Sequence, residues 1–284
     1  NLDNSFKGLI QADGGALNLA VSNTFNNNQG FAQASTDLNV TAGTLSSNAG
    51  GVLSADTGKL TLTAAQQLNN AQGRVQAGQG DIELHAANLD NQGGTVQGDS
   101  LTVTADKVDN GSGGLMASLV GNLQLTVEAL ANRGGKLFGK EQVTVSGATL
   151  DNSAGGQVSG NQINLTSRDT LTNQGGLIEA NQGLALTGGN LDNSVSGQLR
   201  ALGGASSSLN LSGALNNQNG TLEFGSQAFS LDAASLNNQN GMLQHAGTGL
   251  FHLNTASLEG SQGNIQGMGS ADWAFGKVDG LGRV

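Results

Sequence analysis

One motif recurs along the whole chain. It consists of an apolar residue, a variable polar residue and an asparagine, followed by glycine and two short stretches in which apolar and polar residues alternate. Self-similarity at a fixed period of 20–50 residues is typical of solenoids and repeat arrays. The copies here begin 19 to 24 residues apart, about 21 on average. Thirteen residues open them: Leu2, Phe25, Leu45, Leu68, Leu89, Val108, Leu130, Leu150, Leu171, Leu191, Leu215, Leu236 and Leu258.

The alternation within one copy predicts strands. In the segment 171–190, Leu171 alternates with Asn173, Ile178 with Ala180, and Leu184 with Leu186. A period of two places these side chains on one face of an extended chain. Glycine and asparagine between the three stretches indicate turns. One copy therefore predicts three strands that form one closed coil.

The same apolar positions recur in every copy, which fixes how the coils stack. Two residues after the glycine, all thirteen residues are apolar: Ile10, Ala32, Leu53, Val75, Val96, Met116, Leu137, Val158, Ile178, Leu199, Leu222, Leu243 and Ile265. A parallel strand that returns to its own sheet does so with a right-handed connection. We therefore predict an all-β fold, a right-handed parallel β-helix (β-solenoid) of about 13 coils with three short strands each.

An asparagine column is the second signature of the repeat. A buried primary amide can donate to one neighbouring coil and accept from the other, so we predict a structural asparagine ladder. A row of ligand-binding amides is the functional alternative. Eleven of the thirteen places hold asparagine, and Ser47 and Gly260 hold the others. The ladder residues are Asn4, Asn27, Asn70, Asn91, Asn110, Asn132, Asn152, Asn173, Asn193, Asn217 and Asn238.

Composition excludes several classes of function. A net charge of −10 disfavours nucleic-acid binding, which needs basic stripes. The absence of cysteine excludes disulfides and thiolate chemistry. No cofactor or metal is expected, since the sequence contains neither a GGxGxD nor an HExxH motif. The chain opens in mid-pattern at NLDN, with no apolar run long enough to span a membrane, which suggests a segment of a longer array.

The repeats resemble a known family. The runs LDNSAGGQVSGNQINLTS, LTNQGGLIEANQGLALTG and NLDNQGGTVQGDSLTVTA are similar to the haemagglutinin repeat of filamentous haemagglutinin-type exoproteins. These include adhesins and contact-dependent growth inhibition toxins of Gram-negative bacteria. The resemblance extends from Leu2 to about Gly267. It implies a secreted, extracellular filament on the bacterial surface, exported through an outer-membrane two-partner-secretion transporter and joined to the rest of the same exoprotein.

Three functions follow as hypotheses. The first is a structural rod segment that extends and presents adhesive or toxic domains to target cells. The second is an adhesive module that binds a receptor or glycan through its outer face. The third and weakest is a carbohydrate-active β-helix enzyme, which needs clustered carboxylates. The acidic residues are spread singly, although Asp90 and Asp109 lie one coil apart. We therefore expect no enzymatic activity.

Two outward-facing sets of residues are candidate binding surfaces. Alternation from Gly135 places Leu137 inside and predicts a basic–aromatic patch outside, formed by Arg133, Lys136, Phe138 and Lys140. Such a patch suits an anionic or sugar ligand, but an ordinary charged strand also explains it. The outward residues after the first three glycines predict an apolar stripe of Leu9, Phe31 and Val52.

The end of the chain and the histidines depart from the pattern. We predict a repeat domain over 1–267 and an irregular last strand and tail over 268–284, either frayed or a cap or junction. Trp273 and Phe275 are expected at third-strand positions there. We predict that His245 faces inward and His252 outward, which excludes a shared metal site.

Overall fold

The computed structural model describes residues 1–284 and is built from 27 β-strands, with no helix. The chain divides into two compact units, unit 1 at Asn1–Val145 and unit 2 at Ser146–Val284.

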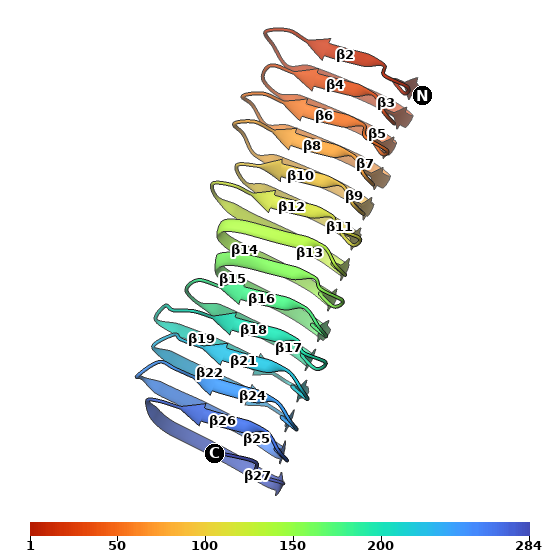
Figure 1. The fold of residues 1–284 in the computed structure, drawn as a ribbon. Helices are drawn as coiled ribbons and strands as arrows, with labels where there is room; N and C mark the ends of the chain where they lie inside the picture. The colour runs from red at the N-terminus through yellow and green to blue at the C-terminus, as the bar shows by residue number, and fades with distance from the viewer. The chain divides into compact units, whose positions relative to one another are not determined.

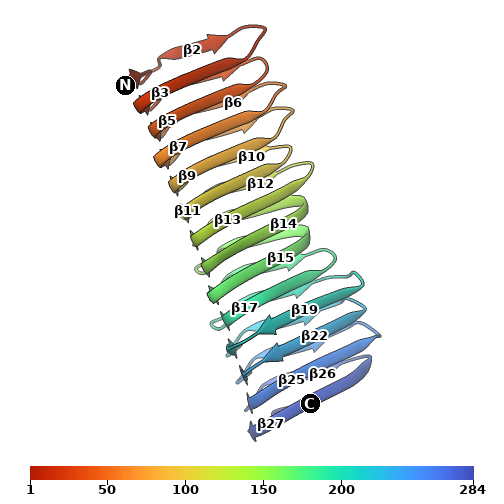
Figure 2. The ribbon, with the colours of Figure 1, turned by 180° about the vertical axis from the view of Figure 1, so that it is seen from behind.

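Unit 1 alternates short strands with long ones. In Figure 1 its short strands follow one another in a single layer, and Figure 2, turned by 180°, presents its long strands. The short strands are β2 (Leu9–Ala12), β4 (Phe31–Ala34), β6 (Val52–Ala55), β8 (Arg74–Ala77), β10 (Thr95–Gly98) and β12 (Leu115–Ser118). The long strands are β3 (Leu17–Asn26), β5 (Leu38–Ser46), β7 (Leu60–Asn69), β9 (Ile82–Asp90), β11 (Leu101–Asp109) and β13 (Asn122–Ala131). The unit begins with β1 (Leu2–Asp3), and β14 (Lys136–Asp151) starts within it.

Each strand of unit 1 pairs in parallel with its equivalent one coil away. The apolar residue two positions after the glycine stays in register, so that Val96 of β10 lies between Val75 of β8 and Met116 of β12. All three side chains are fully buried. The register predicted from the repeat is therefore the register of the hydrogen-bonded sheets, and the parallel β-solenoid of about 13 coils is confirmed.

The long strands contain a bend. Along β5 the buried residues Leu38, Val40 and Ala42 are two apart, but the next buried residue, Leu45, is three further on. The pairing of β5 with β7 shifts register at the same place. The third predicted strand of one coil and the first strand of the next are therefore one continuous element with a corner inside it.

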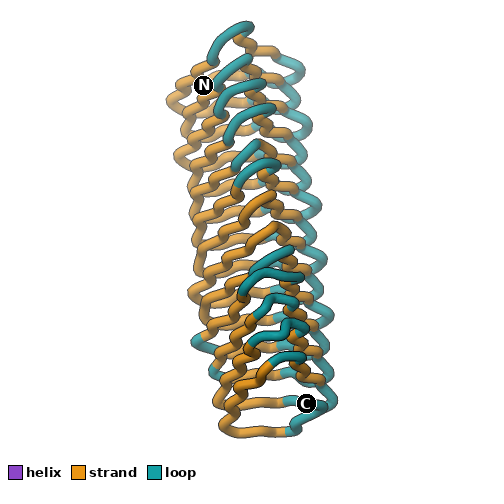
Figure 3. The backbone as a smooth tube through the Cα atoms, turned by 90° about the vertical axis from the view of Figure 1, so that its left-hand side faces the viewer, coloured by secondary structure: helices purple, strands orange, loops and turns teal.

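Unit 2 contains the same elements in more varied lengths. Loops follow one another at the corners of the coils within each unit (Figure 3). The third strand and the following first strand are separate elements only around β19/β20 and β22/β23, where the predicted three strands per coil are all distinct. The strands are β15 (Gln157–Thr172), β16 (Leu177–Ala180), β17 (Leu184–Asp192), β18 (Gln198–Ala201), β19 (Ser206–Leu211), β20 (Ala214–Asn216), β21 (Thr221–Phe224), β22 (Ala228–Ala233), β23 (Ser235–Asn237), β24 (Met242–His245), β25 (Leu250–Glu259), β26 (Asn264–Gly267) and β27 (Ser270–Asp279).

The last strand is regular. β27 pairs in parallel with β25 from Leu250 opposite Ser270 to Glu259 opposite Asp279. Trp273 lies opposite Leu253, a fully buried third-strand residue, as the repeat predicts. Whether 268–284 acts as a cap or a junction stays a prediction.

The closing glycine of each turn is required by close packing. A Cβ added to Gly30 would lie 1.9 Å from the backbone oxygen of Asn4, one coil away. A Cβ at Gly135 would lie equally close to the backbone oxygen of Asn110. No real Cβ makes such a contact, so a side chain here forces the coils apart. The glycine of the motif therefore sets the close approach that the asparagine side chains need.

Candidate functional site

The asparagine column forms chains of amide–amide hydrogen bonds within each unit. In unit 1 the Nδ2 of Asn70 donates to Oδ1 of Asn91 at 2.7 Å. The Nδ2 of Asn91 donates in turn to Oδ1 of Asn110 at 2.7 Å. In unit 2 the same bonds join Asn152, Asn173, Asn193, Asn217 and Asn238 at 2.7 to 2.8 Å. Almost all of these side chains are fully buried. Because these amides are buried and their Nδ2 atoms donate within the protein, a ligand has no access to them.

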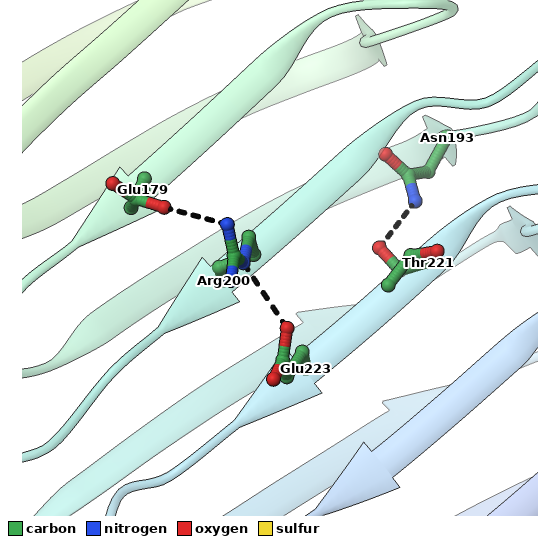
Figure 4. A network of polar contacts seen from close by, with 5 residues as sticks. All are labelled: Glu179, Asn193, Arg200, Thr221 and Glu223. Carbon is green, nitrogen blue, oxygen red and sulfur yellow. Dashed lines mark hydrogen bonds and ion pairs between the residues drawn. The ribbon is translucent and has the colours of Figure 1, made fainter.

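Each amide also bonds the backbone of the following coil. The Nδ2 of Asn193 donates to the backbone oxygen of Thr221 at 3.1 Å (Figure 4). It also donates to Oδ1 of Asn217 at 2.8 Å. It donates to the oxygen of Gly197 in its own turn as well. A single asparagine thus closes its turn and joins two coils, which is a structural task.

The ladder of unit 1 has a defect at Ser47. Asn27 Nδ2 donates to Ser47 Oγ at 3.0 Å, but Oδ1 of Asn70, one coil further on, is buried and receives no hydrogen bond from the protein. The serine side chain is too short to carry the chain of amide bonds onward. The exception at position 47 is visible in the sequence, whereas the unsatisfied acceptor on Asn70 is visible only in the structure.

The acidic residues before the asparagines cap the turns. Asp109 Oδ1 accepts from the backbone N–H of Gly111 at 2.9 Å, and Asp90 Oδ1 accepts from Gln92 at 3.0 Å. The second oxygen of Asp109 accepts from the Gln92 amide at 2.8 Å. Asp90 and Asp109 are neighbours in register, as the repeat predicts, but their oxygens serve the turns. Three of the four carboxylate oxygens therefore accept hydrogen bonds within the turns.

The same capping hydrogen bonds lower the pKa of the acidic residue at two exposed turns. Hydrogen bonds from the side chain and backbone of Ser5 lower the pKa of Asp3 below its usual range. Ser261 does the same to the pKa of Glu259. Hydrogen bonds to the charged carboxylate favour that form, so these groups stay ionised.

The predicted basic–aromatic patch lies on the outer face of unit 1. On β14, Lys136 and Lys140 are exposed, Phe138 is half-buried between them and Leu137 is fully buried. Arg133 is exposed in the preceding turn. The preceding coil places the smaller Ala117 of β12 beside Phe138. The residues share one region of surface, and their role in binding stays a prediction.

Charged residues on other outer faces pair with each other. In unit 2, Arg200 lies between two glutamates from neighbouring coils, 3.0 Å from Glu179 and 3.1 Å from Glu223 (Figure 4). In unit 1, Glu83 bonds Lys59 and lies 3.4 Å from His85. The hydrogen bond from Lys59 lowers the pKa of Glu83. Both clusters join coils and leave little capacity for a ligand.

The histidines occupy separate environments. His245 is fully buried, and its Nε2 donates to the backbone oxygen of Ser226 at 2.8 Å. It belongs to an aromatic cluster with Phe229 and Phe251. His252 faces outward, where its Nδ1 bonds Asp272 at 2.8 Å.

The described residues contain no group of three or more histidine, aspartate and glutamate side chains placed to hold a metal ion. No helix of the length and apolarity needed to cross a membrane is present.

Coils of about 21 residues, a parallel β-solenoid core and an internal amide ladder define a solenoid repeat protein. The profile of the haemagglutinin repeat family matches residues 10–72, 57–120 and 118–175, and the chain belongs to this family. No curated protein and no solved structure matches the chain.

Proposed function

We propose that this chain is a structural spacer segment of a secreted, cell-surface filamentous exoprotein, which extends and presents adhesive or toxic domains to target cells. Membership of the haemagglutinin repeat family supports this role. The observation that carries it is the pairing of strands, which joins each coil only to its neighbours in each unit. A protein built in this way gains length by adding coils and leaves its chemistry to other domains.

The same architecture suits export of an unfolded chain through a transporter in the outer membrane. Because a coil needs only one neighbour for its backbone and amide hydrogen bonds, coils can form one after another as the chain emerges. Each new coil buries its apolar column and closes one rung of the asparagine ladder. Folding outside the cell would then oppose backward movement of the chain, with no other source of energy required.

A spacer role is tested by measuring how far from the cell surface the chain can hold another domain. The chain would be placed between an outer-membrane anchor and a reporter that binds a ligand fixed on a second cell. A matched variant would lack one whole coil, residues 70–90, so that Asn91 takes the place of Asn70 in the turn. We expect a graded loss of reporter engagement with each coil removed, and no loss from substitutions on the outer face.

The adhesive alternative is tested in the same cells with the reporter removed. The half-buried Phe138 between two exposed lysines is the observation that favours it. The variant Lys136→Glu/Phe138→Ser/Lys140→Glu removes this patch and keeps the buried Leu137. Cell contact that persists without the reporter and disappears in this variant would replace the spacer role with receptor or glycan binding at the patch.

A further inference from the structure

A groove of about 340 Å³ lies on the outer face of the short strands β4, β6 and β8 in unit 1. It exists because one side chain in an outward column is short. Gln33, Ser54 and Gln76 are neighbours in register on three successive coils. The column also holds glutamine at Gln11 and Gln97, so Ser54 leaves a notch one side chain deep.

The adjacent outward column supplies an apolar surface. Phe31 of β4 lies beside Val52 of β6, and both side chains are half-buried and line the groove. Val52 is followed in register by Arg74 of β8. An aromatic ring and an aliphatic side chain therefore lie next to the notch, with a cation at one end.

The polar side chains of this groove have no partners in the protein. Gln33, Ser54, Asp56, Arg74 and Gln76 make no side-chain hydrogen bond and no ion pair with other residues. In the charged clusters described above, by contrast, opposite charges are paired. Five polar groups thus converge around an apolar surface with their hydrogen-bonding capacity turned to the outside.

We propose that this groove binds a pyranose unit of a neutral glycan. Its volume lies at the lower end of the range of small-molecule sites, which combine apolar walls with a few convergent polar groups. The C–H face of a sugar ring packs on Phe31 and Val52. The two glutamine amides, each both donor and acceptor, and the hydroxyl of Ser54 match sugar hydroxyls. One acid and one cation, Asp56 and Arg74, balance in charge, which favours hydroxyl groups over a phosphate or a carboxylate.

The glutamine column extends the site along the stack of coils. Coils repeat at about 4.8 Å, close to the length that one pyranose ring adds to an extended glycan. A ring at Ser54 therefore has its two neighbouring units beside Gln33 and Gln76. Gln11 and Gln97 lie one coil further out on either side and can meet the units beyond them. This inference goes beyond a spacer role and is independent of it, since a solenoid of any function can carry such a groove.

The test uses the whole chain and a variant that fills the notch. Ser54→Gln completes the glutamine column and keeps all buried residues, so we expect wild-type circular dichroism and melting. Ser159→Gln is the matched control, because Ser159 holds the equivalent outward position on β15, opposite Glu179 of β16. The probes are tetrasaccharides of glucose, of N-acetylglucosamine and of galacturonic acid, measured by saturation-transfer NMR and titration.

We expect saturable binding of at least one neutral tetrasaccharide, at least tenfold weaker in Ser54→Gln and unchanged in Ser159→Gln. Phe31→Ser, which removes the ring, is expected to weaken binding to a similar degree. The proposal is overturned if no probe binds saturably, if only the galacturonate binds, or if Ser54→Gln binds as tightly as the wild type.

Discussion

Replacing Ser47 with asparagine should stabilise the protein. The new Oδ1 would accept from Asn27, and the new Nδ2 would donate to Oδ1 of Asn70, which is buried without a donor. A buried unsatisfied acceptor costs about 1–3 kcal/mol. Ordering the longer side chain offsets part of the gain, so we expect about 1–2 kcal/mol of added stability.

The turn at position 47 already has the shape that asparagine needs. Its left-handed residues Ala49 and Gly50 have φ of 52° and 90°. The turn of Asn110 has 54° and 84° at the equivalent residues, Ser112 and Gly113. There the asparagine donates both to Gly114 in its own turn and to the next coil. The substitution therefore requires no change of backbone.

Urea unfolding followed by far-ultraviolet circular dichroism measures the effect. A higher midpoint at an unchanged slope reports stability alone, and melting should rise by roughly 2–4 °C for each kcal/mol. Asn91→Ser is the reverse control, because it creates the same defect at Asn110 and should cost about 1–3 kcal/mol. Destabilisation by Asn91→Ser together with no gain from Ser47→Asn would refute the reasoning.

Three further outcomes follow from the contacts. Gly30→Ala should cost more than about 3 kcal/mol, because its Cβ meets the backbone oxygen of Asn4, whereas Gly15→Ala, with no atom within 4 Å, should be nearly neutral in urea melts. Arg200→Ala should cost about 1 kcal/mol at low ionic strength and less in about 0.5 M salt, because its two ion pairs are partly exposed. The hydrogen bond to Asp272 raises the pKa of His252. The bond between the charged histidine and Asp272 therefore stabilises the folded state fully below the unfolded pKa of about 6.5, and this stabilisation disappears as pH rises through the pKa of the folded state. Melting temperatures of wild type and His252→Gln should therefore differ most in acid and converge at higher pH.

The sequence predicted the stacking because inward residues repeat in type and spacing. Leu53 and Val75 follow their glycines by the same two residues and lie in register in the sheet. The corner inside the long strands was not predictable in detail. Ala42, Gly43 and Thr44 are small and carry no mark of the residue at which the alternation shifts.

The candidate sites were less accessible to sequence reasoning. Phe31 and Val52 can be placed outside from alternation alone, but the notch beside them depends on which residue of the next column lies opposite. To predict the notch, one needs the register between neighbouring coils as well as the alternation pattern within each coil. The capping of turns by the aspartates was missed for a similar reason, although an acidic residue two before a turn N–H is a known signal of such caps.

Inner and outer columns of this solenoid are under different physical constraints, and function should be sought where the outer ones change. An inward residue such as Leu53 contacts both neighbouring coils, so its size is fixed by close packing. An outward residue such as Ser54 contacts its neighbours only at the surface and can vary at little cost. The break at Ser54 in a run of glutamines is therefore not demanded by the fold. Such a break is the kind of feature that binding of a ligand explains.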